Sequence, residues 1–382
     1  MRVRIDNRAG LADAATWVAR NLRLRSTEPV YGGALLTTTP GGLVVEGFDT
    51  TTATRFQIPA EVAEAGSVLV SARLLAEVAR LLPNHPVDLD ATGGGELAAA
   101  CGSSRARLPL MPVEDYPQRP AAATVSWWCE AESLASEVVR VAAAASSDPG
   151  TPALTCVVLD LPAGGEPLRL YATDRASLAT ARMPAEPTGP DVDGGRVLVT
   201  AAALEPAVRA LAGDPGRRIG FGTDGSVLVL ETATRRITLA TLDCEAPDFE
   251  RVLSAAAGCE FVAPRAEFEA ALKRVSLHKD APKARIDCAA NELRIGVRGQ
   301  HGTSQETLAV DYTGEPVAVG MFTHRLAAAL HHVGGDLAHF TVPAAPNRPW
   351  LLRPVADDGA PDDTYRHMVI PAKLLDGEEA AA

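Results

Sequence analysis

One local pattern of apolar and polar residues occurs three times along the chain. In each copy a short run rich in β-branched residues precedes Ser71, Thr200 or Thr323, and apolar residues spaced three and four apart follow. The run is typical of a strand, and the spacing of an amphipathic helix whose N-cap is the hydroxyl residue. Gly213 and Gly334 are expected to end the second and third helices. The apolar positions of the three helices are Leu74, Val78 and Leu81; Leu204, Val208 and Leu211; and Leu326, Leu330 and Val333.

The spacing of the copies indicates an internal repeat. The hydroxyl residues are 129 and 123 residues apart, close to one third of the 382-residue chain. A second set of helical segments, at 17–20, 137–140 and 271–274, recurs at a similar interval, and alternating strands such as 227–231 follow. Such a repeat predicts an α+β fold of three similar domains, each with two helices packed on antiparallel sheets. Pro206 predicts a kink or a later start in the second helix.

Two segments have the composition of links between domains. Segments 111–117 and 246–252 contain proline and acidic residues, and a run of alanines follows each. An acidic loop is expected at 357–363 and a frayed tail at 378–382. The predicted domains are 1–121, 122–253 and 254–382.

Composition narrows the class of protein. Apolar residues make up 47% of the chain, which is enough for sizeable cores, and aromatic residues only 4%, so Val, Leu and Ala must fill them. The chain has 36 Lys and Arg against 48 Asp and Glu, a net charge of −12. This balance argues against a protein that simply coats nucleic acid by electrostatic attraction.

The lack of targeting signals and the scattered cysteines point to the cytoplasm. No stretch approaches the roughly 20 apolar residues of a membrane span, and the start of the chain has no apolar segment of a signal peptide. The six cysteines are scattered without a Cys-x-x-Cys spacing. We therefore expect reduced thiols in a cytoplasmic protein.

Short motifs spread over the whole chain carry a family signature. They read MPVEDYP at 111–117, YATDR at 171–175, PDF followed by RV at 247–252, and VIPAKL at 369–374, and GSVLVSARLL at 66–75 agrees with them. As a set they resemble the bacterial sliding clamp, the β subunit of DNA polymerase III. The resemblance implies a head-to-tail homodimer whose six domains close a ring around duplex DNA, with helices lining the hole. It also implies three kinds of protein partner: the replicative polymerase, the clamp loader and repair proteins.

A ring that holds DNA topologically can be acidic outside but needs a positive lumen that slides on phosphates without reading bases. Basic residues recur on the same helices of the repeats, and the resemblance places a DNA-contacting arginine at Arg25. For any single residue a solvated helix face is the alternative, but the recurrence favours DNA. The lumen candidates are Arg20, Arg23, Arg25, Arg73, Arg80, Arg140, Arg209, Lys273 and Arg274.

The family also binds linear motifs of its partners in a groove between the second and third domains. A few buried apolar anchors supply most of the energy of such binding. Core packing beside an exposed C-terminus is the alternative interpretation of these positions. The residues that match the family's groove, with Arg251 and Lys373 at its rim, are Leu154, Thr173, Arg175, Ala176, Ser177, Leu178, Pro247, Arg251, Val252, Met368, Ile370, Pro371 and Lys373.

Three departures from the family lie in or beside this groove. Ala176 and Ser177 stand where the family usually has a bulky residue and then arginine. The family's Phe-Asn-Pro-x-Tyr-Leu is MFTHRL at 321–326, and its terminal Met-Pro-x-Arg-Leu is IPAKL at 370–374. Two functions therefore stay open: a processivity clamp, or a specialised second-copy clamp whose altered groove escapes a clamp-directed inhibitor.

The sequence shows no active site. Asp49 and Asp174 follow strands, where an aspartate more often caps a turn than acts as an acid or base. The histidines at 331–332 and His339 lack metal-ligand spacing, and the glycines at 93–95 lack the Lys-Thr and helix of a phosphate loop. We expect a non-catalytic protein with no metal and no cofactor.

Overall fold

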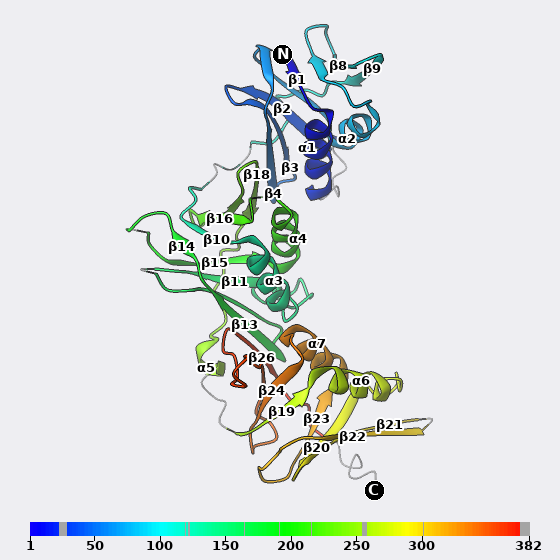
Figure 1. Cartoon of the computed structure of the whole chain (residues 1–382), viewed down its shortest axis with the longest axis vertical. Helices are drawn as coiled ribbons and strands as arrows, with labels where there is room; N and C mark the ends of the chain where they lie inside the picture. Colours follow the sequence, from blue (N-terminus) through cyan, green and yellow to red (C-terminus); the bar gives the residue numbers. More distant parts are fainter. Residues whose placement is uncertain are drawn as a thin grey trace. The chain divides into compact units, whose positions relative to one another are not determined.

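The computed structural model describes most of the chain, and its helices and antiparallel sheets form an α+β fold, as predicted (Figure 1). The described residues are 1–22, 29–118, 120, 123–163, 165–190, 192–214, 216–253, 258–300 and 302–374. The predicted Arg23, Arg25 and tail at 378–382 lie outside these ranges, as does the side chain of Arg251.

The chain divides into two compact units. Unit 1 comprises Met1–Ala135, Ala163–Gly165 and Ala185–Asp243. Unit 2 comprises Ser136–Pro162, Glu166–Pro184 and Cys244–Ala382. The observed division is into two units, so the finer division into the domains 1–121, 122–253 and 254–382 stays a prediction.

The repeated strand–helix pattern is confirmed in all three copies. Leu204, Val208 and Leu211 of the second helix are buried as predicted, and so are Leu326, Leu330 and Val333 of the third. The three copies are β6 (Ser67–Ser71) with α2 (Ala72–Leu81), β15 (Gly195–Thr200) with α4 (Ala201–Ala212), and β23 (Val317–Phe322) with α7 (Thr323–Val333).

The predicted N-caps differ from one copy to the next. The Ser71 hydroxyl accepts a hydrogen bond from the Leu74 N–H at 3.3 Å, as expected. Thr200 is at the N-cap of α4, but its hydroxyl makes no capping bond. Thr323 is the first residue of α7, with Phe322 at the N-cap, and its hydroxyl donates to the carbonyl of Pro282 instead of capping the helix. The capping prediction is therefore right for one hydroxyl and wrong for two.

The helix ends follow the sequence more closely. Gly213 and Gly334 are the C-caps of α4 and α7, and Gly334 takes a left-handed φ of 74° that favours glycine. The predicted later start of α4 is wrong, since the helix begins at Ala201 and runs through Pro206. A proline there removes one hydrogen bond, and the helix continues beyond it.

Helix α2 buries a different face from the predicted one. Leu74 and Leu81 are 37% and 86% exposed, whereas Leu75, Ala76 and Ala79 are buried. Both stripes of the helix carry apolar residues at helical spacing, so periodicity alone could not distinguish them. The alanine-rich stripe is the one that packs, because α2 lies close against α1 (Arg8–Asn21) and β6.

Unit 1 holds two antiparallel sheets. The five-stranded sheet has the order β5 (Glu61–Glu64), β1 (Arg2–Ile5), β7 (Val87–Asp90), β8 (Glu96–Cys101) and β9 (Ser104–Pro109). The nine-stranded sheet has the order β14 (Glu186–Pro187), β10 (Trp127–Glu130), β16 (Arg218–Thr223), β17 (Val227–Glu231), β18 (Arg235–Ala240), β4 (Thr52–Ile58), β3 (Gly42–Phe48), β2 (Gly33–Thr39) and β6. Helix α1 packs on both α2 and α4, and the short helix η1 spans Pro29–Gly32.

Unit 2 positions the candidate site. Its larger sheet contains, side by side, β11 (Cys156–Leu161), β12 (Leu168–Thr173), β13 (Ser177–Met183), β26 (Tyr365–Val369), β25 (Trp350–Pro354), β24 (Leu337–Val342) and β19 (Cys259–Pro264). The smaller one has the order β22 (Gly302–Ala309), β21 (Glu292–Gly299), β20 (Lys283–Ala289) and β23. The short helices η2 and α5 span Pro152–Thr155 and Glu250–Leu253, and α3 (Ala131–Ala142) enters from unit 1.

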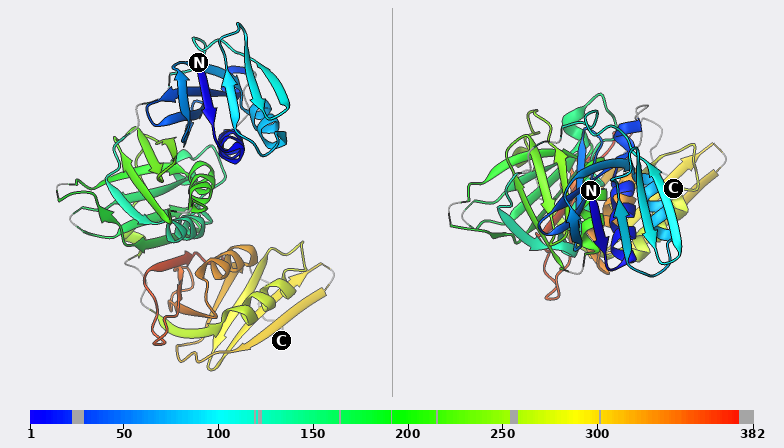
Figure 2. Two further views of the ribbon diagram at one scale, coloured as in Figure 1. Left: turned by 45° about the horizontal axis from the view of Figure 1, so that its top comes forward. Right: turned by 90° about the horizontal axis from the view of Figure 1, so that it is seen from above.

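Helices α6 (Arg265–Val275) and α7 pack against each other in unit 2, where Figure 2 shows them in yellow-green and orange. Helix α7 also packs on β26 and β25, so the last strand of the chain is held between β13, β25 and a helix. In the described part of the chain no helix has the length and apolar character required to cross a membrane.

Candidate docking groove and exposed basic residues

An apolar cavity of about 270 Å³ opens on unit 2. Nine of the thirteen residues predicted for the groove line it: Leu154, Thr173, Arg175, Ser177, Leu178, Pro247, Val252, Met368 and Ile370. Ala176, Pro371 and Lys373 are described but do not line the cavity, and Asp248, Phe249 and Pro349 line it without having been predicted. Asp248 and Phe249 belong to the quoted motif at 247–252, whereas Pro349 has no signal in the sequence.

A tight turn between β12 and β13 forms the first wall. The Asp174 carboxylate accepts hydrogen bonds from the N–H groups of Ala176 and Ser177, at 3.0 and 2.7 Å. Arg175, between Asp174 and Ala176, has a left-handed φ of 76°. Asp174 therefore caps a turn, as the sequence favours, and Asp49 does the same for the N–H groups at 51 and 52.

An ion pair braces this turn from the side. Arg325, on α7, donates from Nη1 to the second carboxylate oxygen of Asp174, and both side chains are about three-quarters buried. Arg325 is one of the departures from the family pattern. The structure thus links the departure at 321–326 to the turn that carries Ala176 and Ser177.

The C-terminal segment forms the second wall. Leu178 on β13 is directly opposite Met368 on β26. Beyond the strand, the Ile370 N–H donates to the Ala176 carbonyl at 2.8 Å, and the Ala372 N–H donates to Gly320 at 2.7 Å. Main-chain hydrogen bonds on both sides therefore hold this segment, and Ile370 keeps 38% of its surface exposed at the groove.

The segment at 247–252 forms the third wall and is anchored by an aromatic contact. The Phe249 ring stacks on Tyr171 of β12, with 4.9 Å between centroids and an interplanar angle of 11°. Both residues are buried. A stacked pair of this kind fixes the segment against the sheet and places Pro247 and Val252 at the cavity.

Beneath the groove, on the helix side of β26, lies a buried polar cluster. The Tyr365 hydroxyl is 2.9 Å from His367 Nδ1, and the Arg140 guanidinium lies 3.8 Å from the centroid of the Tyr365 ring. Burial lowers the pKa of His367 to about 3 and raises that of Tyr365 well above its usual range. Near neutral pH the inner side of this strand therefore carries a neutral imidazole.

Arg140 has a structural partner instead of an open face. Its Nε and Nη2 donate to the carbonyls of His332 and Val333 at 2.6 and 2.8 Å, and its side chain is 19% exposed. It thus satisfies carbonyl groups that the end of α7 leaves unpaired. These bonds favour a structural role for Arg140 over contact with DNA in a lumen.

The other described lumen candidates are exposed on helices. Arg20 lies in the last turn of α1, and Lys273 lies on α6. Three candidates are paired with glutamates: Arg73 with Glu77, Arg209 with Glu205, and Arg274 with Glu306. Arg80 is exposed in the last turn of α2. Glutamate carboxylates thus partly neutralise the positive charge of these three arginines.

Four of the six cysteine thiols are buried packing groups. All six cysteines are free, and Cys101, Cys129, Cys156 and Cys288 are buried. Burial raises the pKa of the Cys129 and Cys288 thiols to about 12, so thiolates are scarce there. Within the described ranges, no three His, Cys, Asp or Glu side chains gather as metal ligands would.

Comparisons with known proteins agree with this geometry. Residues 1–120 match the family model "DNA polymerase III beta subunit, N-terminal domain". The beta sliding clamp of Streptomyces coelicolor is 31% identical over 98% of this chain and 100% of its own length. The beta sliding clamp homolog GriR of Streptomyces muensis is 28% identical over the same shares. A crystal structure of a sliding clamp from Pseudomonas aeruginosa bound to griselimycin has a TM-score of 0.86 and 23% identity, over 98% of this chain and 100% of that one.

Proposed function

Because the chain belongs to the β sliding clamp family, we propose that it confers processivity on the replicative DNA polymerase. It encircles duplex DNA as a head-to-tail homodimer whose six domains form a ring, and it docks partners through linear motifs. It performs no chemistry of its own and works in the cytoplasm. It binds duplex DNA without reading its sequence. Its protein partners are the replicative polymerase, the clamp loader and repair proteins.

The observation that carries this proposal is the apolar groove of unit 2. Three segments far apart in the sequence, at 171–178, 247–252 and 368–370, meet around one cavity of about 270 Å³. The cavity is apolar, and Leu178 and Met368 form its floor as a cross-strand pair. Such a pocket suits the apolar anchors that give short peptides most of their binding energy.

We further propose the domains 1–121, 122–253 and 254–382 and a lumen lined by basic residues of the helices. The proposed groove keeps the thirteen predicted residues and adds Asp248, Phe249 and Pro349. The lumen set is Arg20, Arg23, Arg25, Arg73, Arg80, Arg209, Lys273 and Arg274.

The test of this function is topological. A clamp loader should place the protein on a closed DNA circle, where it should stay until the circle is cut. Equal loss from cut and uncut circles would contradict encirclement. In solution, light scattering at micromolar concentration should give the mass of a dimer, because one chain supplies only half of a six-domain ring.

A second function is favoured by the departures at Ala176, Ser177 and Arg325. The homolog GriR and the griselimycin-bound clamp resemble this chain over nearly its whole length. A specialised second-copy clamp with an altered groove would bind a clamp-directed inhibitor poorly. Griselimycin should then bind this protein more weakly than it binds the Streptomyces coelicolor clamp, and the gene should still replace a housekeeping clamp. Equal affinities for griselimycin would exclude this function.

A further inference from the structure

A second, polar pocket of about 330 Å³ lies on the same sheet of unit 2 as the apolar groove. Arg169, Arg182 and Arg366 line it together with Thr180 and Tyr171. Arg169 and Arg182 are directly opposite each other on β12 and β13, and Thr180 is opposite Arg366 on β26. Since side chains two residues apart share one face of a strand, the three arginines lie on one face of three adjacent strands.

The two pockets are consecutive along the same strands. The groove contains the pair Leu178 and Met368, and the polar pocket contains the next pair on that face, Thr180 and Arg366. Two residues of a strand span about 7 Å. An extended peptide that leaves the groove along these strands would therefore reach the polar pocket within about two residues.

One aromatic pair separates the pockets. Phe249 lines the groove, Tyr171 lines the polar pocket, and their rings stack at 4.9 Å. The short helix α5 continues from one to the other, with Val252 at the groove and Leu253 at the polar pocket. The polar pocket is thus an extension of the groove beyond a shared wall.

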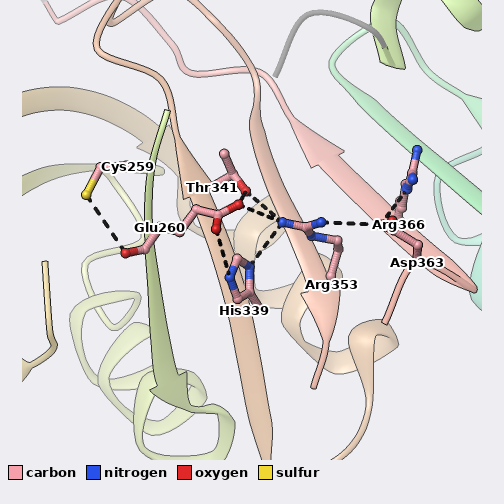
Figure 3. Close-up of polar contacts among 7 residues, drawn as sticks. All are labelled: Cys259, Glu260, His339, Thr341, Arg353, Asp363 and Arg366. Carbon is pink, nitrogen blue, oxygen red and sulfur yellow. Dashed lines mark hydrogen bonds and ion pairs between the residues drawn. The ribbon is translucent and has the colours of Figure 1, made fainter. Parts of the chain in front are cut away.

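The charge of the polar pocket is opposite to that of the whole chain. Three arginines line it against a single carboxylate, Asp363, in a chain of net charge −12. Asp363 accepts from Arg366 and also from Arg353, which in turn bonds Glu260 (Figure 3). These hydrogen bonds, that of Arg366 above all, hold the pKa of Asp363 below its usual range.

Arg182 is the open member of the set. Asp160 on β11 is directly opposite Arg169, so that arginine has a carboxylate beside it. Arg182 is exposed, and among the described residues no carboxylate pairs with its guanidinium. Like charges directly opposite on neighbouring strands are destabilising, so the facing pair of Arg169 and Arg182 would gain from an added anion.

We propose that this pocket, hereafter the arginine pocket, binds acidic side chains that flank the apolar anchors of a docking peptide by about two residues. The inference rests on the proposed docking function of the groove. A carboxylate suits the site because guanidinium groups bind it through paired hydrogen bonds, which a lysine or a neutral side chain of the peptide could not form. The arginine pocket would thus make the clamp prefer partners whose motifs border acidic residues.

The experiment uses a labelled peptide copied from the clamp-binding segment of the replicative polymerase. Three further versions carry two aspartates before the anchors, two aspartates after them, or two lysines at whichever end the aspartates favour. One of the aspartate versions should bind the dimeric protein about three- to tenfold more tightly than the parent peptide, and the lysine version more weakly. The gain should shrink with added salt, because the charges are partly exposed.

Variants of the protein then test whether the gain in affinity from the aspartates comes from the arginine pocket. Arg182→Glu should abolish the gain from the aspartates while the parent peptide keeps its affinity. Arg298→Glu, an equal charge change at an exposed position of β21, should leave the gain intact. Ile370→Asp, in the groove, should weaken every peptide. Parent and both aspartate peptides of equal affinity would overturn the arginine pocket but not the groove, whereas no binding by any peptide would overturn the proposed docking function and this inference with it.

Discussion

Asp174 shows how a single carboxylate can determine the shape of a binding surface. One of its oxygens holds the N–H groups of Ala176 and Ser177, and the other accepts from Arg325. In the family pattern the positions of Ser177 and Arg325 usually hold arginine and tyrosine. Here a guanidinium reaches the same turn from α7, so the turn keeps a cation although the groove wall itself has none at position 177.

The first prediction concerns the two small residues of this turn. The double variant Ala176→Phe, Ser177→Arg restores a bulky group and a guanidinium that can hydrogen-bond a peptide carbonyl. We expect ligands that depend on those features to gain about 1.5–3 kcal/mol, or roughly ten- to a hundredfold in affinity. Compact cyclic peptides should gain most, and long extended motifs, which spread their contacts along the groove, should gain least.

The measurement is a titration of one cyclic and one extended labelled peptide against both proteins, with thermal melting to verify the fold of the variant. Affinities that do not differ for either ligand would mean that Ala176 and Ser177 are neutral. The specialised second-copy function would then be withdrawn.

The second prediction concerns His367, which is buried and contacts Tyr365. Arg140, His332 and Asp174 are the other charged or titratable groups around it. Since burial lowers its folded pKa to about 3, the unfolded chain binds a proton there below pH about 6.5 and the folded chain does not. The contribution of His367 to stability is therefore fully present above that pH, and it falls by about 1.4 kcal/mol per pH unit between pH about 6.5 and 3.

His367→Gln keeps a polar side chain that cannot titrate. Between pH 6 and 4 the unfolding free energy of this variant should therefore fall less steeply than that of the parent, by about 1.4 kcal/mol per pH unit, the share of one proton. Chemical denaturation at a series of pH values measures this slope. His331→Gln, at the end of α7, is the control for a general effect of losing a histidine. Parallel pH profiles for the His367 variant and the parent would contradict a neutral buried imidazole.

Among the elements, α2 marks the limit of what periodicity can predict. The sequence predicted its strand, its start and the Ser71 cap, yet it assigned the buried face to Leu74 and Leu81. The exposed and buried stripes are offset by one position, and the buried one is rich in alanine because α1 approaches closely. Closeness of a neighbouring helix is a tertiary property that local sequence does not encode.

The third prediction compares two leucine-to-alanine variants of this helix, one at a buried and one at an exposed position. Leu75→Ala removes a side chain that is 1% exposed, and should cost about 2–4 kcal/mol of unfolding free energy. Leu81→Ala makes the same chemical change at a position that is 86% exposed, and should cost less than about 0.5 kcal/mol. Urea denaturation of the two variants measures both. Similar losses would mean that the observed burial of α2 is wrong or that Leu81 is covered in the assembly.

The groove shows the same limit between elements. Most of its lining could be predicted because the motifs at 171–175, 247–252 and 369–374 match those of a known family. The stack of Tyr171 on Phe249, the ion pair of Arg325 with Asp174, and the place of Pro349 could not, because each joins segments far apart in the chain. Such contacts depend on strand order, and no spacing within the sequence specifies it.

At the scale of the whole molecule, the distribution of charge matters more than its sum. A chain of net charge −12 would repel DNA if it only coated it by electrostatic attraction, yet the basic candidates that the structure describes lie on helices. Several of them are paired with glutamates, as Arg73 is with Glu77 and Arg274 with Glu306. These ion pairs leave only a weak attraction between the helices and DNA. A weak attraction suits a ring that must slide, because the closed ring and not the attraction keeps it on DNA.

The fourth prediction tests the attraction of these side chains to DNA by its dependence on salt. Changing Arg20, Arg25 and Arg73 together to Ala should lower the slope of log affinity against log salt by about 1 for each phosphate that the protein no longer neutralises. Because Arg73 also bonds Glu77, its share should be the smallest. Retention on closed circles should persist, since the ring itself stays intact.

A matched control is the triple change of Arg105, Arg107 and Arg298 to Ala, which removes the same charge from exposed positions of β9 and β21. Affinity for linear duplex DNA at several salt concentrations gives the slopes of all three proteins. If the control lowers the slope as much as the change of Arg20, Arg25 and Arg73 does, the effect comes from net charge and not from side chains in a lumen. A slope unchanged by the change of Arg20, Arg25 and Arg73 would place these side chains away from DNA, because a protein that neutralises fewer phosphates must release fewer counterions.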